Sequence, residues 1–243
     1  MKILGIDTSG YANAVGITDG NDTLADEIFP ARADSLGQII TNIDTVLARA
    51  RLRLEDIDGF GIGLGPGSWT GIRIGVTVAK ILAYSRDKPV AGISTLEALA
   101  YNHTGSPAQV CPIISVGTRD AVYAALYRRQ GEKMIRLSDY YVGDIHGLAG
   151  IIKEPTVFVS AEENSYPDVI RRTLDAPDME AGMVTGVPGG AVVARLAAER
   201  LECSDSDNPL ALTPLYLKES TARAFVNRYA GNAPTGRTDK PSC

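Results

Sequence analysis

The segment GIGLGPGSWTGIRIGVTVAK, residues 61–80, decides the fold of this chain. A turn rich in glycine at 65–71 joins a short apolar run, residues 60–64, to a longer run of helical character at 70–85. A strand, a glycine turn and a helix in this order can form a phosphate-binding loop. The same glycines can instead let two backbones pack closely, because glycine has no Cβ.

Two nucleotide-binding motifs can be tested against this segment. The Walker loop, G-x-x-x-x-G-K-[ST], is excluded, because no lysine follows any of the glycines and Lys80 lies deep in the expected helix. Residues 65–71 come close to the dinucleotide fingerprint. That fingerprint needs an acidic residue at the end of the next strand to hold the ribose, whereas this strand ends at residues 93–95, IST. Dinucleotide binding is therefore disfavoured.

The helix after the glycine turn is apolar around most of its circumference. Between residues 72 and 84 its polar groups are those of Arg73, Thr77, Lys80 and the Tyr84 hydroxyl. Such a helix is buried on more than one side. Its second side packs either against this chain or against a partner protein, and core packing is the more common of the two.

The composition is that of an ordinary globular protein, with 44% hydrophobic and 22% charged residues among 243. This length allows one large domain or two small ones. The net charge of −5 argues against binding a nucleic-acid backbone without a partner. No apolar run is long enough for a membrane helix, and Asp7 interrupts the N-terminal stretch before it could form a signal peptide. Three cysteines without C-x-x-C spacing indicate free thiols in the cytoplasm.

Hydrophobic periodicity predicts the order of the elements. In the first half we expect strands at 2–7, 11–19, 23–29, 60–64 and 89–93, and helices at 35–50, 70–85 and 95–101, the first capped by Asp34 or Ser35. In the second half we expect strands at 110–115, 121–127, 133–141 and 156–160, and helices at 144–152, 165–174 and 190–202. Each half begins with a meander of strands, which suggests two related α/β domains with mixed sheets flanked by helices.

Four strings are similar to the TsaB family, a bacterial subunit of the machinery that makes threonylcarbamoyladenosine at position 37 of tRNA. They are LGIDTSG (4–10), GPGSWTGIRIGVTVAK (65–80), VAGISTLEALA (90–100) and PLYLK (214–218). The similarity is good over 1–127, loose up to 213 and absent after Ser220. It implies the actin-like ATPase (ASKHA, ribonuclease H-like) fold. We therefore expect a first domain at 1–105 joined by 205–220, a second, smaller one at 106–204, and a loose tail at 221–243.

The resemblance implies a protein without catalytic residues or a metal. TsaD, the transferase of the same pathway, carries a motif similar to G-V-N-H-L-E-x-H, whose two histidines bind the metal. The motif falls on residues 92–99, where Thr95 and Leu99 replace the histidines, and leucine cannot ligate a metal. The two histidines of this chain, His103 and His146, lack a ligand spacing and are expected at the surface or at helix ends. A glycoprotease activity is disfavoured for the same reason.

The turn after the first strand binds phosphate in kinases of this fold, which resemble D-x-G-[ST] there. This chain has Asp7-Thr8-Ser9-Gly10, with a serine in place of the glycine. Asp7 can hold a hydrated metal, but it can equally stabilise the turn by accepting local N–H bonds. Residues 189–190 are similar to the adenosine loop of the fold, although a Pro-Gly-Gly helix start also explains them. Weak nucleotide binding at Asp7–Gly10 therefore stays open, and a small-molecule kinase or ATPase is the alternative function.

The resemblance also implies partners. The partner surface of the family resembles a bundle of the first two helices, here 35–50 and 70–85, packed against the same helices of a TsaD-like transferase. The interface residues expected from it are Ile39, Ile43, Gly71, Ile74, Gly75, Val78 and Leu82. Like surfaces can pair as a homodimer when the transferase is absent. A TsaE-like ATPase is expected as a further partner. ATP or ADP and a metal are expected to bind to the partner subunits. The chain is expected to reach tRNA only through the complex, and no membrane is expected to take part.

Two positions depart from the family pattern. Members often show His-Ser or His-Thr at the start of the first helix, where this chain has Asp34-Ser35. They also tend to show Asp-Ala-Arg before the hairpin of the second domain, where this chain has residues 117–119, GTR. Arg119 and Tyr123 keep the spacing, but the aspartate is missing. The role of that aspartate is therefore not transferred to this chain.

Overall fold

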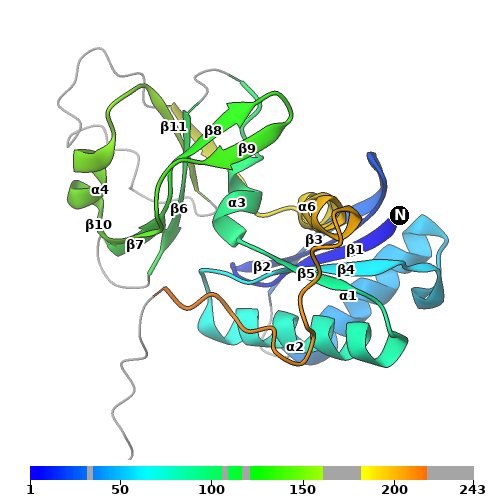
Figure 1. The fold of residues 1–243 in the computed structure, drawn as a ribbon. Helices are drawn as coiled ribbons and strands as arrows, with labels where there is room; N and C mark the ends of the chain where they lie inside the picture. Colours follow the sequence, from blue (N-terminus) through cyan, green and yellow to red (C-terminus); the bar gives the residue numbers. More distant parts are fainter. Residues whose placement is uncertain (32–34, 106–108, 117–120, 161–181, 218–243) are drawn as a thin grey trace, which may run out of the picture.

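Two β-sheets organise the chain, one in each of two lobes (Figure 1). The structure is a computed structural model that describes residues 1–31, 35–105, 109–116, 121–160 and 182–217. Within these residues no helix is both long enough and apolar enough to cross a membrane.

The sheet of the first lobe has the strand order β3-β2-β1-β4-β5. Its strands are β1 (Lys2–Asp7), β2 (Ala12–Asp19), β3 (Asp22–Pro30), β4 (Gly59–Gly63) and β5 (Val90–Ile93). The first three form an antiparallel meander, while β4 and β5 run parallel to β1. Because parallel strands end at the same edge, the turns that follow β1, β4 and β5 come together there.

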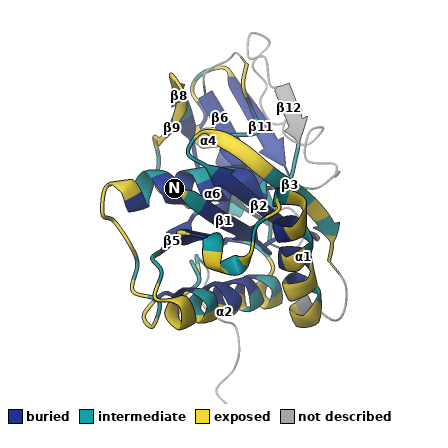
Figure 2. Cartoon of the chain, turned by 90° about the vertical axis from the view of Figure 1, so that its right-hand side faces the viewer, coloured by how far each residue is buried: buried dark blue, intermediate teal, exposed yellow. Residues whose placement is uncertain are grey.

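Helices cover both faces of this sheet. α1 (Ser35–Ala50) and α2 (Trp69–Arg86) lie on one face, α6 (Gly190–Glu202) lies on the other, and a short 3₁₀ turn, η1 (Leu54–Asp56), precedes β4 (Figure 1). Side chains alternate along β1: Leu4 and Ile6 join the core under α1 and α2, and Ile3 joins the core under α6. Figure 2 shows the result, with buried strands at the centre and exposed residues on the outer sides of α1 and α2.

α6 lies against the sheet backbone without intervening side chains. A Cβ added at Gly5 would be 2.2 Å from the carbonyl oxygen of Gly190, and one at Gly16 would be 2.2 Å from the nitrogen of Ala191. Only glycine permits this approach. Asp26, on β3, accepts a hydrogen bond of 3.0 Å from the Ala191 N–H and so caps the start of the helix.

The sheet of the second lobe has the main order β10-β7-β6-β11-β12, and β8 pairs with β6 and β9. Its strands are β6 (Gln109–Ser115), β7 (Ala121–Ala124), β8 (Tyr127–Gln130), β9 (Lys133–Arg136), β10 (Tyr141–Asp144), β11 (Thr156–Ser160) and β12 (Gly182–Thr185). α4 (Ile145–Ile151) packs into one core of this lobe, and α3 (Thr95–Ala100) packs into the other. The Asp144 carboxylate caps α4 by accepting from the Gly147 N–H at 2.8 Å, which lowers the pKa of Asp144.

The predicted single strands at 121–127 and 133–141 are wrong, because each is divided in two. The chain leaves the sheet after β7 and re-enters as β8, so that β6 pairs with both. At the break the N–H of Leu126 donates to the Ser138 hydroxyl at 3.0 Å, and the Leu126 carbonyl accepts from Leu137 at 2.7 Å. This bend moves β8 onto β9 and leaves β7 to pair with β10.

The path of the chain also differs from the predicted domain limits. α6 was expected in a second domain ending at residue 204, but it packs on the sheet of the first lobe, because the glycines of that sheet leave room for its backbone. The C-terminal segment 207–217 then runs along β5 and α2 (Figure 1), and it is held by a hydrogen bond of 2.8 Å from the Asp207 N–H to the Val90 carbonyl. The expected helix at 165–174 and the tail at 221–243 lie outside the described residues.

The packing of α6 predicts that Gly16→Ala destabilises the protein by about 3 kcal/mol or more, because the new methyl group overlaps backbone that cannot move aside. Urea unfolding followed by circular dichroism measures this loss. Gly150→Ala, in α4, is the matched control, since no atom lies within 4 Å of its added Cβ, and it should be neutral or slightly stabilising. A Gly16→Ala protein as stable as the parent would contradict the packing.

Candidate functional site

The turn after β1 brings Asp7 to the edge where the parallel strands end. Its side chain is buried, and its carboxylate accepts three hydrogen bonds from this chain: the Ser9 N–H at 2.8 Å and the Ser9 hydroxyl at 2.5 Å on Oδ1, and the Thr95 hydroxyl at 2.9 Å on Oδ2. The carboxylate also closely approaches Gly63, where a Cβ would be 1.9 Å from Oδ2. Asp7 thus ties together the ends of β1, β4 and β5.

The environment of Asp7 has opposing effects on its ionisation. Burial removes the carboxylate from water and raises its pKa, while the hydrogen bonds from Ser9 and Thr95 act in the opposite direction. These donors occupy three of the roughly four acceptor sites of the carboxylate. The geometry is that of an aspartate that stabilises a turn.

The glycine turn that follows β4 packs directly on the turn after β1. The Ser68 N–H donates to the Ser9 carbonyl at 2.6 Å, the Thr8 hydroxyl donates to the Gly71 carbonyl at 2.8 Å, and the Thr95 N–H donates to the Gly65 carbonyl at 2.9 Å. The Ser68 N–H, the Thr8 hydroxyl and the Thr95 N–H, three donors at this edge, are therefore bonded to carbonyls of the chain itself. Of the two interpretations of the glycines, the structure supports close backbone packing.

A small cavity remains beside the predicted nucleotide-binding residues. It measures about 80 Å³, and Thr8, Gly10, Asn13 and Ile74 are among the residues that line it. Sites for ligands of drug or cofactor size usually measure about 300–1,000 Å³. This cavity therefore has room for water or a small ion but not for a nucleotide in the described conformation.

The positions that correspond to the metal-binding histidines of TsaD are part of the protein interior. Thr95 bonds Asp7, and Leu99 is fully buried in the core around α3. His103 follows the end of α3, as expected, although it is buried there, and His146 is exposed in the first turn of α4. Among the described residues no three His, Cys, Asp or Glu side chains gather as a metal site.

The start of α6, where the adenosine-loop similarity falls, is also occupied by the chain itself. Residues 189–190 begin the helix, and the carboxylate of Asp26 takes the place beside its first N–H groups where an anion could bind. Burial raises the pKa of Asp26, and the hydrogen bonds from the backbone of Gly190 and Ala191 oppose that rise. Gly190 makes the close contact with Gly16.

Several residues predicted to contact a partner lie instead in the core of this chain. Ile39 is 0% exposed, Ile43 and Val78 are also buried, and a Cβ at Gly75 would be 2.2 Å from the hydroxyl oxygen of Thr8. These side chains point to the sheet of this chain. The prediction was wrong because periodicity cannot show which flank of an apolar helix faces inward. The remaining three, Gly71, Ile74 and Leu82, are half-buried.

Sequence reasoning missed the outer stripe of the helix pair α1–α2. Ile81 is 60% exposed and Tyr84 67% exposed on α2, and Leu36 and Ile40 are exposed on α1. The sequence contained a signal for this stripe. Arg73 and Thr77 are polar, and the positions that follow them at helical spacing on the same side of the helix are 81 and 84. We define the outer helix face as Leu36, Ile40, Ile81 and Tyr84.

An aromatic cluster at the start of α2 was also missed. The rings of Trp69 and Tyr216 lie 4.3 Å apart between centroids, and the Arg73 guanidinium lies 4.1 Å from the centre of the Trp69 ring. Arg73 Nε donates to the Tyr216 hydroxyl at 3.0 Å. This cluster holds the end of the C-terminal segment against α2, and it explains why the motif PLYLK accompanies the glycine motif.

Comparisons with known proteins agree with this geometry. The family model described as "TsaD: tRNA N6-adenosine threonylcarbamoyltransferase" matches residues 31–167, more than half of the chain. The TsaB protein of Bacillus subtilis is 27% identical over 227 residues, which are 92% of this chain and 97% of that protein. The TsaB protein of Escherichia coli is 32% identical over 131 residues, 53% of this chain and 56% of that protein.

A solved structure shares the whole architecture. YeaZ from Pseudomonas aeruginosa superposes with a TM-score of 0.75 at 22% sequence identity, over 89% of this chain and 99% of that chain. This likeness establishes the fold, the actin-like ASKHA fold with mixed α/β lobes. From the family match and the fold together, the chain belongs to the TsaB/YeaZ family, which is related to TsaD.

Proposed function

We propose that this chain is a non-catalytic scaffold subunit that dimerises with a TsaD-like transferase. The pair, with a TsaE-like ATPase, threonylcarbamoylates adenosine 37 of tRNAs that decode ANN codons. ATP or ADP and the metal are bound by the partner subunits, and tRNA is contacted through the assembled complex. The relatives from Bacillus subtilis and Escherichia coli carry the name tRNA threonylcarbamoyladenosine biosynthesis protein, which supports this assignment.

One observation carries the non-catalytic part of the proposal: the chain fills its own phosphate turn. The carboxylate of Asp7 accepts from Ser9 and Thr95, and the Ser9 carbonyl accepts from Ser68. A kinase of this fold needs the carboxylate to be available for a metal and the N–H groups of the turn to be available for phosphate, whereas here the Ser9 N–H donates to Asp7 and the Ser68 N–H donates to Ser9. The net charge of −5 further supports a role in which other subunits contact the tRNA phosphates.

The scaffold part of the proposal is supported by the outer helix face. Leu36, Ile40, Ile81 and Tyr84 place apolar surface on the same two helices that the family uses for its partner. Four large side chains at about half exposure or more are costly in water, and burial by a partner helix pair stabilises them. Ile74 and Leu82 are half-buried and pack against the core of the first lobe.

The first prediction concerns Asp7. Asp7→Ala should lower the free energy of unfolding by about 3 kcal/mol, because buried donors on Ser9 and Thr95 lose their acceptor. Asp22→Ala, at an exposed turn, is the control and should be neutral. Steady-state ATP hydrolysis by the isolated parent chain should be absent. Hydrolysis that Asp7→Ala abolishes without a change in stability would favour the ATPase alternative.

The second prediction concerns the outer helix face. Tyr84→Glu and Ile81→Glu should each weaken binding to the host's TsaD-like protein by about a hundredfold, since a partner would bury an unpaired carboxylate. Both variants should fold normally, because these side chains face water in the monomer. Titration calorimetry measures the affinity, and a thermal melt measures the fold.

Val142→Glu, on β10 in the other lobe, is the matched control and should bind as the parent does, since Val142 is also exposed but lies away from α1 and α2. The variants Gly75→Arg and Val78→Glu should instead unfold the chain, because both positions are buried against its own core. Unchanged affinity in both Tyr84→Glu and Ile81→Glu would place the partner surface elsewhere.

The third prediction concerns the cell. Depletion of this protein should lower threonylcarbamoyladenosine in tRNAs that decode ANN codons, because the transferase loses its scaffold. Mass spectrometry of nucleosides from purified tRNA measures the modification. A plasmid copy of the parent gene should restore it, and a Tyr84→Glu copy should not. Normal modification after verified depletion would refute the proposed function but not the fold.

A further inference from the structure

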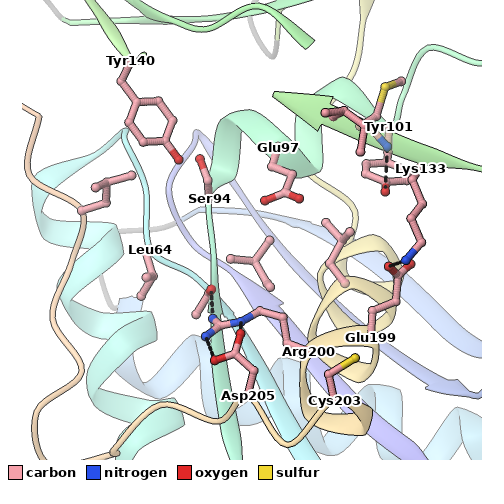
Figure 3. A pocket seen from close by; sticks show the side chains of 16 residues that line it. Leu64, Ser94, Glu97, Tyr101, Lys133, Tyr140, Glu199, Arg200, Cys203 and Asp205 are labelled. Carbon is pink, nitrogen blue, oxygen red and sulfur yellow. Dashed lines mark hydrogen bonds and ion pairs between the residues drawn. The ribbon is translucent and has the colours of Figure 1, made fainter. Parts of the chain in front are cut away.

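A second and larger cavity lies between the two lobes (Figure 3). Its volume is about 600 Å³, which is within the range of small-molecule sites. The first lobe contributes the ends of β4 and β5, part of α6 and the C-terminal segment, and α3 lies where the two lobes meet. The second lobe contributes β9 and Tyr140. Neither the buried turn at Asp7 nor the outer helix face takes part in it.

The charged groups that line this cavity are paired with one exception. Lys133 binds Glu199 at 3.1 Å, and Arg200 binds Asp205 at 2.7 Å. Arg200 also contacts Asp207 at 3.0 Å, just beyond the lining. These pairs hold the hairpin of β9 and the C-terminal segment against α6. They leave the Glu97 carboxylate as the unpaired charge of the lining.

The Glu97 carboxylate points into the open centre of the cavity (Figure 3). In the part of the chain that the structure describes, no hydrogen bond or ion pair reaches it within 4.0 Å. Ser94 and Glu97 have the S-x-x-E spacing of a capping box, yet the Ser94 side chain makes no capping bond; its hydroxyl is buried and interacts with the Tyr127 hydroxyl. The Glu97 carboxylate is therefore the group that is available to a ligand.

The surroundings of Glu97 favour a positive charge beside it. Burial raises the pKa of Glu97; the charge of Glu199 raises it further, and those of Arg136 and Arg200 lower it. Arg136 itself lies over the Tyr140 ring, 4.4 Å from its centre, which shows that this ring accepts a cation on its face. A half-buried, unpaired carboxylate is costly, and a cationic ligand would offset that cost.

Apolar and aromatic groups complete the lining. The Tyr101 and Tyr140 side chains stand on opposite sides of Glu97 (Figure 3), and Leu64, Leu196 and Leu215 also line the cavity. The Tyr101 hydroxyl accepts from the Met134 N–H at 3.1 Å, which fixes its ring. A flat or aliphatic body can therefore lie against these side chains while its charged end meets the carboxylate.

We propose that this cavity binds a small organic cation, an ammonium or amidinium group on an apolar body, with the positive group at Glu97 and the body between the two lobes. The proposal is independent of the scaffold function. Because both lobes line the cavity, such a ligand would stabilise their relative position.

Benzamidine is the probe, and benzamide, its uncharged isostere, is the reference ligand. By saturation-transfer NMR on the full chain, benzamidine should bind and benzamide should bind at least about tenfold more weakly. Glu97→Gln should weaken benzamidine binding about tenfold and so abolish the preference for benzamidine over benzamide. The reason is that glutamine keeps the shape of the glutamate side chain and loses its negative charge. Glu132→Gln, at the exposed turn of the β8–β9 hairpin, is the matched control and should behave as the parent.

A second measurement needs no variant. In protein labelled with ¹³C at the glutamate carboxyls, benzamidine should lower the pKa of Glu97, because the amidinium favours the ionised form, and leave that of Glu132 unchanged. The titratable and charged groups that face Glu97 are Tyr101 on its own helix, Arg136 on β9, Glu199 and Arg200 on α6, Tyr127 and Tyr140, so the carboxyl resonance of Glu97 is assigned separately from that of Glu199 by means of Glu97→Gln. Equal binding of both probes, or a Glu97 pKa unmoved by benzamidine, would overturn the proposal.

Discussion

The contact of α6 with bare sheet backbone is the constraint on which the rest of the molecule depends. Gly5 and Gly16 have no side chain to hold the helix away, so its first turn lies against β1 and β2. The helix starts where the second lobe ends, and the C-terminal segment leaves from its other end. The cavity between the lobes, the ion pairs of Arg200 and the aromatic cluster around Tyr216 all rely on this position.

The edge where β1, β4 and β5 end is held together by hydrogen bonds within the chain. The partners of the Asp7 carboxylate are Ser9 and Thr95. The glycine turn completes the closure through the hydrogen bond between Ser68 and Ser9. The two turns pack closely together, and a cavity of about 80 Å³ lies beside them.

Local sequence patterns predicted the helices and strands well, but they predicted poorly which side of an element packs against the rest of the chain. The strands at 2–7 and 156–160 and the helices at 70–85 and 190–202 are confirmed to within a residue, because alternation and helical spacing depend on neighbours in sequence. The TsaB/YeaZ family and the ASKHA fold are also confirmed. The inward flank of α2 was misassigned at Val78, since both flanks are apolar and only tertiary contacts distinguish them.

Features that depend on distant residues gave no signal in the sequence. The cavity lined by Glu97 joins α3, α6 and β9, and the sequence does not show that these elements meet. The stripe that ends at Tyr84 could have been found by extending the polar positions of α2 by one turn. The sequence of the Asp7 turn fits either an aspartate that holds a hydrated metal or one that stabilises the turn. The hydrogen bonds that Asp7 accepts from Ser9 favour the structural interpretation.

The position of α6 has a consequence for the order in which the chain folds during synthesis. The ribosome completes the strands of the first sheet long before it makes the helix that covers one of their faces. Until then Ile3, Ala91 and Ile93 are exposed to solvent on the nascent chain. Contacts between residues so far apart in sequence form late and slowly. The nascent protein therefore passes through a stage with an uncovered apolar sheet, when it is most dependent on chaperones.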